Sequence, residues 1–136
     1  MIYVKRKRES GQAMVEFALI LPILLLIVCG IIDFGWLFFN QLSLDNACRE
    51  GARYATVHSI DEDCEALTAQ HVENIISPVV DNVTVTITYS SETDRLAGDV
   101  TVKLEAQMNI LTPVLGIISG GQTRPITSEV TMKVET

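Results

Sequence analysis

The sequence predicts an α+β protein in which a long N-terminal transmembrane helix continues into a small domain with a three-stranded antiparallel sheet and a second short helix. Three observations predict this fold class. No charged residue occurs from Phe17 to Ile32, and a membrane span takes roughly 20 apolar residues. Small residues then recur with helical spacing as far as Val57. Beyond residue 80, apolar residues occupy every second position in three segments, which is the period of a half-buried strand.

The pattern divides the chain into three parts. Residues 1–11 form a basic leader and residues 12–39 the transmembrane helix. Residues 40–136 form an extracytoplasmic α+β domain, in which residues 40–57 continue the helix. After the membrane segment, about a hundred residues remain, which suffices for one small domain with a modest core.

The charge is spread unevenly along the chain. Of the formal net charge of −7, residues 1–11 contribute +3 and residues 12–136 contribute −10. Basic flanks of a membrane span stay on the cytoplasmic side, so we expect a cytoplasmic N-terminus and a domain on the other side. The acidic body argues against a nucleic-acid partner, because neutralising phosphates requires Lys and Arg.

Asp33 interrupts the apolar run, which then continues to Phe39. At the helical rise, Asp33 lies about 24 Å from Phe17 along the axis. We therefore place Asp33 near the far boundary of the hydrocarbon, where aromatic residues such as Trp36 are favoured; its role is left open. A cleaved secretory signal is disfavoured, because no Ala-x-Ala-like site follows before Asn40.

The helical pattern does not end with the span. We expect a continuous helix from about Ala13 to Val57, on the order of 65 Å long, with a kink at Pro22. One face of its second half is made almost wholly of small residues, namely Leu44, Ala47, Cys48, Gly51, Ala52 and Ala55. This face either packs on the chain's own domain, which we favour, or lets neighbouring helices approach closely. The two interpretations can coexist.

The remaining elements follow from periodicity and breakers. We expect a short amphipathic helix and then three alternating strands, at residues 66–77, 83–89, 100–108 and 127–134. The strands should form an antiparallel sheet whose apolar face is covered by the two helices. Residues 109–121 read as an apolar loop that either touches a partner or the membrane surface or folds back under the sheet. Its role is left open.

No constellation of catalytic residues is apparent, so we expect a protein that is not an enzyme and has neither cofactor nor metal. An enzyme that uses the acidic residues of 61–65 is the weaker alternative. A metal site of Cys64 with His58 and His71 matches no zinc spacing and is disfavoured. Cys48 and Cys64 would both lie in an oxidising compartment and are a candidate disulfide, although spacing alone cannot establish the bond.

Glu16 is a lone carboxylate at the start of the span. Such a group must be paired, protonated or placed at an interface. If the chain were cut after Gly11, the new amino group on Gln12 would lie one helical turn from Glu16. The cut would also remove the basic leader, and in a bundle of such chains each Glu16 could be neutralised by a neighbour's amine.

Two segments resemble a known family. Gly11 followed by Gln-Ala-Met-Val-Glu16-Phe17 is similar to the processing site of type IV pilins, and more closely to that of the Flp/Tad branch. The stretch up to Pro22 resembles the TadE-like pseudopilin, or minor pilin, family, and so does Arg-Glu-Gly-Ala-Arg within residues 48–55. The strands match that family only in their pattern.

The resemblance implies that a prepilin peptidase cuts between Gly11 and Gln12, and that Glu16 and Phe17 serve assembly. The product would be a minor pilin that supports assembly of a Tad-type Flp pilus for adherence or secretion. Its partners would be a sister pseudopilin, Flp pilin subunits, inner-membrane platform proteins and a secretion ATPase. It would cross the bacterial inner membrane once, with its domain in the periplasm or outside the cell. Incorporation into the pilus is left open, and the alternative is an uncleaved, membrane-anchored binding or adhesion module.

Overall fold

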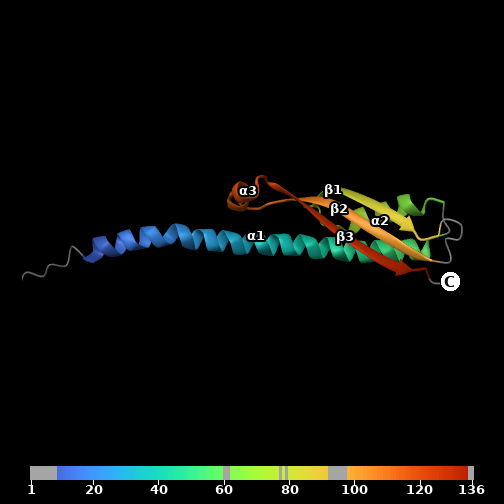
Figure 1. The fold of residues 1–136 in the computed structure, drawn as a ribbon, viewed down its shortest axis with the longest axis horizontal. Coiled ribbons are helices and arrows are strands. Elements are labelled where there is room, and N and C mark those ends of the chain that lie inside the picture. The colour runs from blue at the N-terminus through green and yellow to red at the C-terminus, as the bar shows by residue number, and fades with distance from the viewer. Residues whose placement is uncertain (1–8, 60–61, 77, 79, 92–97, 135–136) are drawn as a thin grey trace, which may run out of the picture.

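The computed structural model describes residues 9–59, 62–76, 78, 80–91 and 98–134. The elements, in chain order, are α1 (Glu9–Val57), α2 (Cys64–Ile75), β1 (Val80–Tyr89), β2 (Asp99–Asn109), α3 (Pro113–Ser119) and β3 (Thr123–Lys133). Figure 1 shows that the first half of α1 extends alone, while the second half carries α2 and the sheet. The predicted α+β class is confirmed. Most of the basic leader, residues 1–8, lies outside the described residues.

α1 is one continuous helix of 49 residues that includes Pro22. Its continuity and its end at Val57 are as the sequence predicts, and the kink at Pro22 stays a prediction. Among the described residues it is the single helix that is long and apolar enough to cross a membrane, and no residue of its most apolar window is buried. Exposed apolar surface on this scale requires a cover, and a single-pass membrane anchor is compatible with it.

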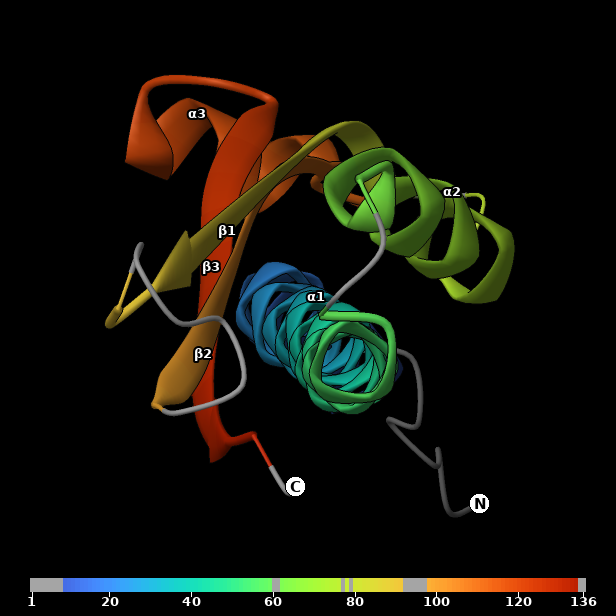
Figure 2. The same cartoon turned by 90° about the vertical axis from the view of Figure 1, so that its right-hand side faces the viewer.

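The small-residue face of α1 is buried, and all six of its members contact the domain: Leu44, Ala47, Cys48, Gly51, Ala52 and Ala55. Viewed along α1, the sheet lies on one side of the helix and α2 packs against another (Figure 2). A Cβ atom added at Gly51 would lie 2.6 Å from Cγ2 of Val72 on α2. Packing on the chain's own domain, the favoured interpretation, is therefore what the structure shows.

Gly51 allows this close approach, and we expect Gly51→Leu to destabilise the domain by about 1–3 kcal/mol, because Val72 is a stiff β-branched side chain in a filled core. The midpoint of thermal unfolding, followed by circular dichroism in detergent, should fall. Gly35→Leu is the matched control, because nothing lies within 4 Å of a Cβ at Gly35. Equal midpoints for the two variants would contradict this account of the packing.

The three strands form an antiparallel sheet in the order β1-β2-β3. The pairing of β2 with β3 runs without interruption from Asp99 opposite Lys133 to Asn109 opposite Thr123. Alternate residues of β2 are buried: Val100, Val102, Leu104, Ala106 and Met108. This alternation confirms the period of 2, and it gives α1 a flat apolar surface to pack on.

One expectation was wrong. Residues 109–121 do not form a plain loop, because they contain α3. Pro113 stands at the first position of α3, where its missing N–H costs nothing. Gly120 ends α3 in the left-handed conformation, with a φ of 76°. Pro113 and Gly120 therefore delimit a short helix.

Candidate functional site: the exposed half of α1 and its junction with the domain

The residues of the predicted processing site lie together in the first turns of α1. Gly11, Gln12, Glu16 and Phe17 are all exposed, and a Cβ at Gly11 would meet nothing within 4 Å. The side-chain amide of Gln12 donates a hydrogen bond to Oε1 of Glu16 at 3.2 Å. The predicted spacing of one helical turn is therefore present, and a donor on residue 12 reaches the carboxylate.

The surface around Glu16 is apolar and belongs to α1 alone. Large exposed apolar residues line the helix from Met14 through Phe39, among them Phe17, Leu19, Ile20, Ile23, Leu24, Ile31, Phe34 and Phe38. Within the part of the chain that the structure describes, no basic side chain forms an ion pair with Glu16. The Glu16 carboxylate thus lies on an apolar surface, and the Gln12 amide is its only described hydrogen-bond partner.

The sequence leaves the role of a second carboxylate, that of Asp33, open, and the structure shows its hydrogen-bond partner. Asp33 is 3% exposed and accepts a hydrogen bond from the backbone N–H of Thr112 at 2.9 Å. The Thr112 hydroxyl donates a second, short hydrogen bond to the other carboxylate oxygen. Thr112 immediately precedes α3, so Asp33 ties α3 to α1. In the sequence, the signal for this contact was a lone acidic residue in an apolar helix, together with Thr-Pro before a second apolar segment.

Two further residues of α1 bond to the domain, and a third, Asn40, is buried beside them and bonds within α1. The indole N–H of Trp36 donates to the backbone carbonyl oxygen of Asn109 at 3.1 Å, and the side-chain amide of Gln41 donates to the carbonyl oxygen of Thr127 at 3.0 Å. The side chain of Asn40 is fully buried and donates to the carbonyl oxygen of Trp36 at 2.8 Å. We call Asp33, Trp36, Asn40 and Gln41 the helix–domain junction. Through it, the end of β2 and the start of α3 are held to α1.

The structure does not contain the candidate disulfide, because Cys48 and Cys64 are both free and buried. Sγ of Cys48 lies 3.2 Å from the carbonyl oxygen of Val102, whereas the Tyr89 hydroxyl donates to Sγ of Cys64 at 3.2 Å. Cys64 packs at Ala55, which is two helical turns beyond Cys48, or about 10 Å along the axis. That separation exceeds what a disulfide can bridge.

We expect both thiols to resist alkylation in the folded protein and to react after unfolding. Burial raises the pKa of the Cys48 thiol, in the half of α1 that lies against the domain. A raised pKa lowers the fraction of reactive thiolate near neutral pH. Mass spectrometry after iodoacetamide treatment, with and without denaturant, measures this. Loss of two hydrogens from the untreated domain would instead reveal a disulfide.

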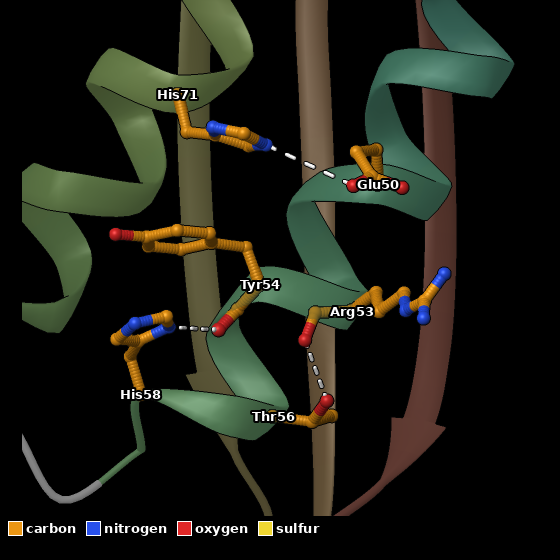
Figure 3. Close-up of polar contacts among 6 residues, drawn as sticks. All are labelled: Glu50, Arg53, Tyr54, Thr56, His58 and His71. Atoms are coloured by element: carbon orange, nitrogen blue, oxygen red, sulfur yellow. Dashed lines mark hydrogen bonds and ion pairs between the residues drawn. The ribbon is translucent and has the colours of Figure 1, made fainter.

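His58 and His71 do not form a metal site with Cys64. The ring of Tyr54 lies between them, with ring centroids 4.0 Å from His58 and 4.6 Å from His71 (Figure 3). Nε2 of His71 points toward Glu50, at 3.9 Å from Oε1 (Figure 3). In the described residues, no group of three or more His, Cys, Asp or Glu side chains is placed to hold a metal ion. The stack joins α2 to α1.

The residues from Gly11 into the small-residue face of α1 resemble one known family. Residues 11–53 match the TadE-like protein family. The match begins at Gly11, includes Glu16 and the helix–domain junction of α1, and ends with the last residue of Arg-Glu-Gly-Ala-Arg. It covers less than half of the chain, and the sheet lies outside it. No curated protein and no solved structure matches the chain. The resemblance seen in the sequence is thus confirmed for α1.

Proposed function

We propose that this protein is a minor pilin, or pseudopilin, that supports assembly of a Tad-type Flp pilus after a prepilin peptidase cuts it between Gly11 and Gln12. The TadE-like match over residues 11–53 favours the association with a Tad pilus. The single observation that carries the proposal is the division of α1. One face of its second half is buried by the domain, while its first half is apolar, exposed and free for a bilayer or for other helices.

Cleavage would add a positive charge close to the Glu16 carboxylate, in the helix that takes part in assembly. The cut would free an α-amino group on Gln12, whose side chain already reaches Glu16 at 3.2 Å. A charged residue at the centre of a bilayer costs about 2.5–3.5 kcal/mol on insertion scales. Pairing Glu16 with an amine of the same or a neighbouring chain removes much of that cost. The carboxylate therefore favours a bundle of processed helices over a single helix in lipid.

The same proposal gives the partners and the place of action. The protein would cross the bacterial inner membrane once, and its domain would lie in the periplasm or outside the cell. Its partners would be the prepilin peptidase, a sister pseudopilin, Flp pilin subunits, platform proteins and the secretion ATPase. The role is one of assembly, so it requires no catalytic group and no nucleic acid.

Processing is tested with glycine variants of the full chain co-expressed with a prepilin peptidase. We expect Gly11→Leu to stay at full length, because a side chain would fill the place where the enzyme approaches the backbone. Gly30→Leu is the matched control, since Gly30 is also in α1 with open space around it, and it should be processed. If wild-type protein enters the membrane but keeps its leader, the uncleaved anchored module becomes the better account.

A further inference from the structure

α3 carries an exposed apolar surface at the end of the domain that faces the first half of α1 (Figure 1). Ile117 is 82% exposed, Ile118 is 75% exposed, and Leu111, just before the helix, is 56% exposed. The other side of α3 faces the protein, where Leu115 lines a cleft with Asp33 and Leu37. α3 thus packs against its own chain on one face, and no residue that the structure describes covers its other face.

The attachment to Asp33 fixes the level of α3 along α1. Both hydrogen bonds from Thr112 end on the Asp33 carboxylate. Asp33 lies about 9 Å before Phe39, the last residue of the span, at the helical rise. The start of α3 therefore lies at the level of the outer part of the span and not above it.

At this level, the exposed apolar surface of α3 continues the exposed apolar surface of α1. Ile32 and Phe34, on either side of Asp33, are 46% and 68% exposed, and Phe38 is 55% exposed. Whatever covers these side chains of α1 has the chemistry to cover Ile117 and Ile118. For an apolar helix that crosses a membrane, that cover is lipid.

We propose that α3, together with Leu111, inserts into the domain-side leaflet of the bilayer. This inference rests on the proposed function only in that α1 spans a membrane. Insertion explains why Asp33 is tolerated in the span. Thr112 satisfies its carboxylate with two hydrogen bonds, and the packing of α3 leaves it 3% exposed. α3 thus shields a charge from lipid at a depth where an unpartnered charge is disfavoured.

Tryptophan fluorescence of the full chain in phospholipid vesicles, at about one chain per vesicle, tests this inference. Trp36 is the single tryptophan and belongs to the helix–domain junction, so it is kept, and each probe is read as the difference from the wild-type chain. The probe is Ile118→Trp, with Ile117→Trp as a second site if the first disturbs the fold. Leu24→Trp reports insertion of α1, and Val57→Trp, at the far end of α1, reports exposure to water. Vesicles with brominated acyl chains quench a buried probe, and iodide quenches an exposed one.

We expect the Ile118→Trp and Leu24→Trp probes to lose intensity with brominated lipid and to be shielded from iodide, while the Val57→Trp probe shows the reverse. Quenching of the Ile118→Trp probe by iodide alone would overturn the inference. Resistance to both quenchers would also overturn it, since another protein surface would then cover α3. A Leu24→Trp probe that brominated lipid does not quench would overturn the membrane anchor itself, and this outcome separates the two failures.

Discussion

Glu16→Ala should abolish incorporation of the protein into Tad pilus assemblies without reducing its insertion into the membrane. The substitution removes the carboxylate that the amine of residue 12 would neutralise in a bundle of processed helices. It also removes a charge at the start of the span, whose cost is below the figure of about 2.5–3.5 kcal/mol for a charge at the bilayer centre, so insertion of a single helix should be unchanged or improved. Membrane fractionation measures insertion, and counting surface pili by electron microscopy measures assembly.

Gln12→Ala is the matched control for that experiment. It removes the side-chain amide that contacts Glu16 at 3.2 Å but leaves the backbone amine that cleavage would create. We therefore expect the Gln12→Ala variant to be processed and to assemble. Normal pilus numbers with Glu16→Ala would contradict the assembly role of the carboxylate. Loss of pili with both variants, despite normal processing, would assign the role to the side-chain contact.

Asp33→Ala should detach α3 from α1 while leaving the sheet folded. The substitution deletes the acceptor of both Thr112 hydrogen bonds, and each hydrogen bond to a charged group contributes about 1.5–3 kcal/mol. Local opening of α3 should thus become more frequent by one to several orders of magnitude. Hydrogen exchange followed by mass spectrometry measures this, with faster exchange expected in peptides that contain Pro113–Ser119.

The control for this variant is Asp45→Ala, also in α1. Asp45 accepts a hydrogen bond from Gln41 of its own helix, so its removal breaks no described hydrogen bond to α3. Exchange in α3 should then stay at the wild-type rate. Unchanged exchange in α3 with Asp33→Ala would show that the apolar contacts of α3, and not the carboxylate, hold it in place.

The elements with a strong local period could be predicted from the sequence. The end of α1 at Val57 and the burial of its small-residue face follow from the helical recurrence of small residues. The three strands follow from alternation, because alternate residues of a strand point to opposite faces of the sheet. In each case, the pattern that predicts the element lies in residues that are neighbours along the chain.

The features that depend on residues far apart in the chain could not be predicted. Asp33 finds its partner at Thr112, 79 positions away, and no local pattern links them. The prolines and glycines of residues 109–121 predict a loop, although Pro113 and Gly120 begin and end a helix there. Cys48 and Cys64 are a candidate pair by compartment alone, whereas in the structure Cys48 contacts Val102 and Cys64 contacts Ala55.

The measurement that tests the proposed role most directly is the mass of the membrane-extracted protein from cells that contain the Tad system and its prepilin peptidase. The account predicts a chain that begins at Gln12 and lacks residues 1–11. A chain in the membrane that retains Met1–Gly11, in cells where the peptidase processes the Flp pilin, would contradict it.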